Sequence, residues 1–292
     1  MMESAERNKR LLSIAENFRR DPSARLVNHL LKKGIIGNPY LATFHQLSGG
    51  DAVFITPWRH LKDRGGMVLD MGVHYTDMIR YQLGDIDEVY GDVRLVESVR
   101  KKPLSTGHHN EFYRLRHEAM MDEYPATAED VSVASMRLKS GIVVNWIVGI
   151  GGNGGCGGEM IFGDKGCLSG FGTRGGSTTL RRTGQDDVSY EELTNSADDF
   201  ELEPLAAHFF PDKMTGDNID FRLLALEYRE FGEAILNGRN LEVDGVEGMK
   251  DVAAIYAIFE SSIAGRAVKM SEVESGELYT YQEGIESALT KS

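Results

Sequence analysis

Three side chains that can transfer or hold protons lie at helical spacing between residues 70 and 77. Asp70, His74 and Asp77 stand at i, i+4 and i+7 of an otherwise apolar stretch, so a helix would present them on one face. Histidine is the usual general base near neutral pH, and a carboxylate one turn away can orient its ring. The spacing predicts that His74, with Asp70 as its partner, takes a proton from a hydroxyl while a hydride leaves the same carbon.

The same residues also have a purely structural interpretation. Asp70 can hydrogen-bond at the start of the helix, and His74 can be a core histidine whose polar atoms are all paired, as most buried polar groups are. The neighbouring glycines favour a site. Gly65 and Gly66 precede the stretch and Gly72 lies within it, and such glycines often mark the close approach of a ligand or of another backbone.

Two other kinds of site are suggested by the sequence and rejected. Residues 149–154 read GIGGNG and satisfy the G-x-G-x-x-G pattern after a strand, but no helix follows to meet a pyrophosphate, so nucleotide binding is not predicted there. Histidines and carboxylates offer metal ligands, but nothing fixes their spacing, and no metal site is predicted. The ligands considered are Asp70, His74, Asp77, His108 and His109, with His45 and His208 in reserve.

Composition narrows the class of protein. The chain has 292 residues, 41% of them hydrophobic, which is enough for a folded core. A net charge of -13 argues against nucleic acid as a partner. We find no long apolar run and no apolar leader behind a basic start, so we expect no membrane span and a cytoplasmic location. The two cysteines, Cys156 and Cys167, are expected to be free thiols.

The order of expected elements is α+β. A helix end at 2–10, a short strand at 11–17 and a helix at 22–33 form an αβα fragment, which a single strand cannot complete. From residue 38 the pattern predicts a large, mostly antiparallel sheet with helices on one face. Expected strands are 40–47, 88–99, 131–138, 142–148, 159–162, 168–171 and 178–182, and expected helices are 67–83, 111–121, 221–236 and 246–264. The apolar positions assigned to the core of the last two helices are Leu223, Leu226, Phe231, Ile235, Val252, Ile255 and Ile258.

Several motifs together resemble those of the Gfo/Idh/MocA oxidoreductases. Asp70-Met-Gly72-Val-His74-Tyr-Thr-Asp77 after Gly65-Gly66 is similar to the family's D-x-G-x-H-x-x-D signature, and Trp58-Arg59 to the pair that often precedes it. The stretch from Ala15 to Pro22 followed by 34–37 resembles the crossover from the family's nucleotide domain. The segments 231–248 and 260–261 resemble its C-terminal helices. The resemblance covers residues 2 to about 270.

The resemblance implies an NAD- or NADP-dependent enzyme acting on a sugar, polyol or glycoside. It places His74 and Asp70 on the catalytic acid–base pair, and Glu16 and Asn17 beside the cofactor. We expect Trp58, Arg59, Asp77, His108 and His109 to contact the substrate. The resemblance also implies a homo-oligomer, a dimer or tetramer, formed through the open face of the sheet.

One departure from the family pattern concerns the nucleotide-binding half. Family members begin with a Rossmann domain that carries a Gly-rich phosphate loop and later a Glu-Lys-Pro, and this sequence begins after that lysine. Residues 1–37 are therefore interpreted as a remnant of the dinucleotide-binding domain, and 38–292 as the substrate-binding and oligomerisation domain. Three origins remain open, namely an upstream start, a separate subunit and a relic gene.

Two functional alternatives to the dehydrogenase also remain open. One is a non-redox subunit that binds a sugar or serves assembly. The other is a lyase or hydratase that uses His74 and Asp70 without a nicotinamide.

Overall fold

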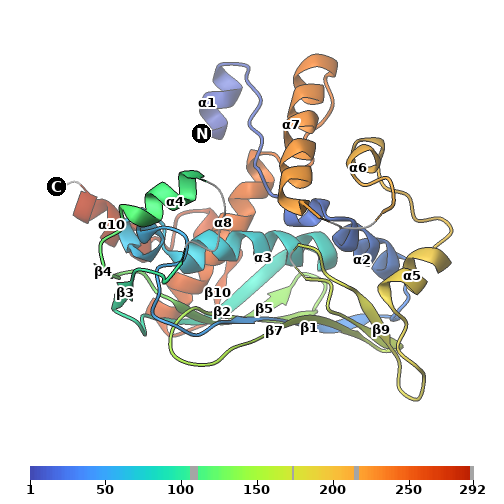
Figure 1. Ribbon diagram of the computed structural model, residues 1–292, viewed down its shortest axis with the longest axis horizontal. Helices are drawn as coiled ribbons and strands as arrows, with labels where there is room; N and C mark the ends of the chain where they lie inside the picture. Colours follow the sequence, from blue (N-terminus) through green and yellow to red (C-terminus); the bar gives the residue numbers. More distant parts are fainter. Residues whose placement is uncertain (106–110, 173, 214–216, 290–292) are drawn as a thin grey trace.

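The computed structural model describes residues 1–105, 111–172, 174–213 and 217–289. An eight-stranded sheet forms the base of the molecule, and the helices lie on one side of it (Figure 1). The strand order is β10-β2-β5-β6-β1-β7-β8-β9, and every neighbouring pair is antiparallel except β1 with β6. The predicted α+β class, with a mostly antiparallel sheet and helices on one face, is confirmed.

The strands form where β-branched and apolar residues alternate with polar ones. In β5, Ala134, Met136 and Leu138 are buried beneath the helices while Val133 is exposed on the opposite face. A separate two-stranded sheet pairs β3 with β4. The strands are β1 (Pro39–Leu47), β2 (Ile86–Arg94), β3 (Val99–Lys101), β4 (Glu123–Pro125), β5 (Val131–Leu138), β6 (Val143–Gly149), β7 (Cys156–Gly163), β8 (Gly166–Ser169), β9 (Thr179–Arg181) and β10 (Val268–Lys269).

Helix starts follow local capping chemistry. The Asp21 side chain accepts a hydrogen bond from the Ser23 amide, and Pro22 occupies the first helical position of α2. Asp244 caps α8 in the same way through the amides of Val246 and Glu247. The helices are α1 (Met2–Arg7), α2 (Pro22–Lys32), α3 (Met67–Leu83), α4 (Glu111–Glu118), α5 (Tyr190–Ser196), α6 (Pro204–Phe209), α7 (Ile219–Asn237), α8 (Gly245–Ala264), α9 (Met270–Glu274) and α10 (Thr280–Leu289). Short 3₁₀ turns span Phe18–Arg20, Pro57–His60 and Lys62–Arg64.

The strand expected at 11–17 does not form. Ser13 makes only an isolated bridge to Asp244, and the Ile14 amide donates to the Val243 carbonyl. A strand needs a continuous neighbour to pair with, and here only a short loop before α8 offers one. The segment therefore joins α1 to the turn at Phe18 without regular secondary structure apart from that bridge.

The core joins α2, α3 and α8 to the sheet. Leu26 and Val27 of α2, Ile79 of α3 and Ile258 of α8 belong to one buried cluster with Trp146 of β6. Residues before position 38 thus share the core of the rest of the chain, and the division at residue 37 stays a prediction. The assignment of Ile235 and Val252 to the core is wrong, because both side chains are exposed. No helix in the described ranges is long and apolar enough to cross a membrane.

Candidate active site

Helix α3 carries three of the predicted site residues, Asp70, His74 and Asp77. It begins after Gly66, whose positive φ of 77° suits glycine, and a Cβ there would meet Ala128 at 2.9 Å. Within the helix, a Cβ on Gly72 would lie 2.5 Å from Ile255 of α8 and 2.9 Å from Trp146 of β6. The close approach predicted from the glycine is thus to α8 and the sheet, and it fixes the height of the helix above them.

His74 is bonded to Glu16, which comes from the extended segment before α2. Nδ1 of His74 lies 2.7 Å from Oε2 of Glu16, and the Glu16 side chain is buried. The Phe18 ring stacks on the imidazole with centroids 4.4 Å apart. Burial opposes protonation of the ring, but the hydrogen bond and charge of Glu16 outweigh it and raise the pKa of His74. An imidazole held this way is oriented on two sides and keeps its proton readily.

Asp70 does not bond to His74, so the expected pairing is corrected. Its carboxylate accepts a hydrogen bond of 2.7 Å from Nε of Arg59, whose Nη1 also donates to the Thr56 hydroxyl. The correction has a simple cause, because two separate segments, one carrying Arg59 and the other Glu16, each supply a partner to α3. Arg59 bonds the Asp70 carboxylate, and Glu16 bonds the His74 imidazole. The charge of Asp70 still contributes to raising the pKa of His74.

Asp77 is withdrawn from the site. Its side chain is fully buried. The carboxylate accepts a hydrogen bond of 2.9 Å from Nε of Arg19 and another from Nη2 of the same guanidinium. One further turn along α3 carries it under the 3₁₀ turn Phe18–Arg20, away from the pocket-facing residues. Asp77 therefore joins α3 to that turn, and its predicted contact with substrate is not supported by its position.

A pocket of about 280 Å³ opens beside Asp70 and His74. Its wall combines hydrogen-bonding groups with apolar side chains, the mixture typical of a small-molecule site. Asn17, Arg59, Asp70 and His74 were predicted as site residues from the sequence. The full lining is Asn17, Phe18, Gln46, Phe54, Ile55, Arg59, Asp70, Met71, His74, Tyr75 and Arg174.

The loop before α3 forms one wall of this pocket. Nε2 of the buried His60 accepts a hydrogen bond of 2.9 Å from the Phe54 amide. Burial and the nearby Arg100 lower the pKa of His60 to about 4, so the ring stays neutral and able to accept. Ile55 has a φ of 56°, an uncommon conformation for a β-branched residue. The loop is thus held in a defined shape with Phe54 and Ile55 at the pocket.

The remaining predicted site residues lie in different places. Trp58 is outside the pocket lining and is half-exposed, with the Arg59 guanidinium 4.5 Å from its ring centroid. Its ring supports the Arg59 guanidinium, and its contact with substrate stays a prediction. His108 and His109 lie outside the described residues. Asn17 lines the pocket, and its Oδ1 is buried without a hydrogen-bond partner among the described residues.

Sequence reasoning missed several lining residues. Arg174 lies in the glycine-rich loop after β8, and a lone arginine among glycines was the available signal. Gln46 is near the end of β1, and its Oε1 accepts the Tyr75 hydroxyl. Phe18 follows Asn17 directly. These three residues come from three separate segments, so only the folded chain brings them together.

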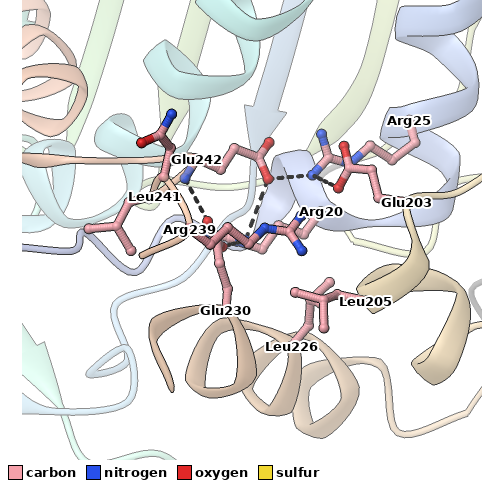
Figure 2. A pocket seen from close by; sticks show the side chains of 10 residues that line it. Arg20, Arg25, Glu203, Leu205, Leu226, Glu230, Arg239, Leu241 and Glu242 are labelled. Atoms are coloured by element: carbon pink, nitrogen blue, oxygen red, sulfur yellow. Dashed lines mark hydrogen bonds and ion pairs between the residues drawn. The ribbon is translucent and has the colours of Figure 1, made fainter. Parts of the chain in front are cut away.

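A network of charges on the far side of Glu16 holds its segment in place. Nε of Arg20 donates to the Glu16 carbonyl at 3.1 Å, and its Nη1 contacts Glu230 and Glu242. Glu242 also accepts from Arg25 at 2.5 Å. Figure 2 shows these side chains converging from the turn Phe18–Arg20, α2, α7 and the loop before α8. The paired charges in the wall of this pocket anchor the segment bearing Glu16.

The described residues do not fit a dinucleotide. After β6 the glycines at 149–154 form a turn that leads directly into β7, and no helix begins there. A Cβ on Gly49 would lie 2.8 Å from the Gly154 amide, so this turn packs on backbone. The Glu16 carboxylate, expected beside the cofactor, bonds the His74 imidazole instead. The parts of the chain that the structure describes therefore offer no pyrophosphate cradle.

Comparison with known proteins agrees with this arrangement. A family model described as the GFO/IDH/MocA C-terminal domain matches residues 24–169, half of the chain. The chain belongs to the Gfo/Idh/MocA family. A curated relative, the D-apiose dehydrogenase of Paraburkholderia graminis, is 30% identical over 98 residues, which are 34% of this chain and 26% of that protein. The match thus spans about a quarter of the relative's length.

Solved structures show that this Gfo/Idh/MocA chain shares its fold with larger oxidoreductases. An oxidoreductase from Agrobacterium radiobacter, in complex with NAD+, L-tartaric acid and magnesium, matches with a TM-score of 0.64 at 20% identity, over 92% of this chain and 68% of that one. Levoglucosan dehydrogenase in complex with NADH gives 0.65 at 18%, with the same coverages. Aldose-aldose oxidoreductase from Caulobacter crescentus, complexed with glycerol, gives 0.62 at 18%, over 92% and 66%.

Proposed function

We propose that this chain is the carbohydrate-binding and acid–base part of a sugar or polyol oxidoreductase. The observation that carries the proposal is the His74–Glu16 pair at the wall of a small pocket that also presents Asp70 and Asn17. Relatives named as sugar dehydrogenases support the substrate class. NAD or NADP would supply hydride acceptance, held by groups other than the described residues.

The residues of the pocket divide the work of binding and proton transfer. A substrate hydroxyl beside His74 gives its proton to the imidazole, and the imidazolium that results is stabilised by Glu16. Asn17 Oδ1 and the Asp70 carboxylate accept hydrogen bonds from other hydroxyls, and Phe18 and Met71 cover carbon-bound hydrogens. Glu16 is a positioning residue, because it acts through the ring of His74.

A turnover assay tests the proposal. The chain is incubated with NAD+ or NADP+ and a panel of polyols and aldoses, together with a Gfo/Idh/MocA nucleotide-binding domain supplied as a separate polypeptide, because the described residues offer no dinucleotide cradle. Nicotinamide absorbance is followed for wild type, His74→Gln and the control His29→Gln. His29 is on α2 and pairs with Asp199 outside the pocket. We expect substrate-dependent reduction that His74→Gln abolishes and His29→Gln retains. Equal rates in wild type and His74→Gln would contradict the assignment.

A second function is favoured by one observation, the missing pyrophosphate cradle among the described residues. On this reading the chain is a non-redox carbohydrate-binding subunit with the same pocket. Calorimetric binding of a polyol without any turnover by wild type would select this second function over the first.

A further inference from the structure

More basic than acidic side chains line the pocket. Arg59, His74 and Arg174 are basic, and Asp70 is the single carboxylate among the lining residues. Arg59 is paired with Asp70, which also lines the pocket. His74 is paired with Glu16, which is not among the lining residues. Arg174 is the basic group whose partner lies elsewhere.

The partner of Arg174 is an exposed carboxylate at the start of α7. Nη1 of Arg174 lies 2.6 Å from Oδ1 of Asp220, whose side chain is 59% exposed. Ion pairs in such exposed positions contribute little, because water and salt screen them. A guanidinium has five N–H donors, and the contact with Asp220 uses one nitrogen. Arg174 can therefore bind an anionic ligand at small cost.

Phe18 fixes the place of Arg174 relative to His74. The Arg174 guanidinium carbon lies 5.1 Å from the centroid of the Phe18 ring, and that ring stacks on the His74 imidazole at 4.4 Å. The guanidinium and the imidazole thus both lie against one aromatic ring. A single small molecule in the 280 Å³ pocket can reach both groups.

Hydroxyl acceptors complete the recognition pattern. Oδ1 of Asn17 is buried in the pocket wall without a partner among the described residues, which is costly unless a ligand donates to it. Asp70 keeps further acceptor capacity on its carboxylate. A simple carboxylate would leave these acceptors empty, and a neutral polyol would leave Arg174 unused.

We propose that the pocket selects a sugar acid, a polyhydroxy carboxylate whose carboxylate binds Arg174 and whose hydroxyls reach His74, Asp70 and Asn17. This inference rests on the proposed function and narrows its substrate class. In the free chain the pKa of His74 is raised, mainly by Glu16, and the nearby positive charge of Arg174 partly opposes that rise. A bound carboxylate offsets that charge, so a sugar acid raises the pKa of His74 more than a neutral polyol does.

The test is a calorimetric titration of the full chain with D-gluconate and with D-glucitol, its neutral counterpart. Wild type is compared with Arg174→Gln, with Arg174→Lys, and with Arg181→Gln as the control. Arg181 is likewise exposed and pairs with Asp187, but it lies outside the pocket. We expect gluconate to bind about 10-fold more tightly than glucitol, as a charge-assisted contact supplies.

The variants then separate the possible results. Arg174→Gln should reduce gluconate affinity to the level of glucitol without changing glucitol affinity, Arg174→Lys should restore part of it, and Arg181→Gln should change neither. Equal binding of the two ligands by wild type, or unchanged gluconate affinity in Arg174→Gln, overturns the sugar-acid inference and leaves the proposed function standing. Binding of neither ligand overturns the carbohydrate site itself, and with it both proposals.

Discussion

His74 takes its chemical character from a residue 58 positions earlier in the chain. Glu16 bonds the ring, Phe18 covers it, and Asp70 adds a weaker charge from one helical turn away. From the sequence, Glu16 was expected beside the cofactor and Asp70 beside the imidazole. Glu16 controls the proton on the imidazole, and Asp70 controls the position of Arg59.

This division predicts an order of effects on the pKa of His74. Glu16→Gln should lower it strongly, because burial of the ring is then opposed only by the weaker charge of Asp70, and Asp70→Asn should lower it less. Imidazole NMR over a pH titration measures both. A larger effect from Asp70→Asn would show that Asp70 is the partner of His74.

The same pair predicts how stability changes with pH. Because the folded pKa of His74 is raised, its contribution to stability is complete below the unfolded value of about 6.5 and is lost as pH rises through the folded pKa. Urea unfolding of wild type and Glu16→Gln should therefore differ most at mildly acidic pH, by about 1 kcal/mol. A difference that grows toward alkaline pH would contradict the sign of the shift.

Asp77 provides a test of the corrected assignment. Asp77→Asn leaves the buried Arg19 guanidinium without its counter-charge and should cost about 3–5 kcal/mol of unfolding free energy. Replacing both residues by apolar ones should recover much of that loss. A stable Asp77→Asn variant with weakened polyol binding would instead restore Asp77 to the substrate site.

At the scale of elements, α3 was the easiest to predict. Its expected bounds, 67–83, are those observed, because glycines flank an amphipathic run. The segment 11–17 was assigned as a strand from its apolar residues, and it lacks the neighbour that would make it one. The Glu16–His74 contact was also out of reach, since nothing local in either segment announces a partner 58 residues away.

The packing of α3 on α8 depends on Gly72. Gly72→Ala brings a Cβ into Ile255 and Trp146 and should destabilise the chain by about 1–3 kcal/mol. The matched control is Gly232→Ala in α7, where nothing lies within 4 Å of the added carbon and a gain of about 0.5–1 kcal/mol is expected. Thermal or urea unfolding of the pair settles this, and equal effects would refute the packing argument.

For the whole molecule, no described helix covers the face of the sheet opposite α3 and α8 (Figure 1). Tyr90 of β2 and Val133 of β5 alternate with buried residues, so they lie on that face, and both are about half exposed. The homo-oligomer predicted from the family resemblance would cover this face, since an open sheet with apolar side chains favours association. The homo-oligomer stays a prediction.

Sedimentation velocity measures the association state directly. Val133→Asp should shift the chain toward a monomer, because it places a charge in the predicted interface. Leu115→Asp, on the exposed side of α4, should leave the association state unchanged. A monomeric wild type, or an oligomer indifferent to Val133→Asp, would mean that this face is not the interface.

The central claim is that His74 lies in a carbohydrate site, and one NMR titration tests it most directly. The Cε1 resonance of His74, assigned by its loss in His74→Gln, is followed while a polyol or sugar acid is added to the wild-type chain. The account predicts a saturable shift of this resonance, with the resonance of His29 unchanged as the internal control. A ligand that binds by calorimetry and leaves the His74 resonance unmoved would contradict the account.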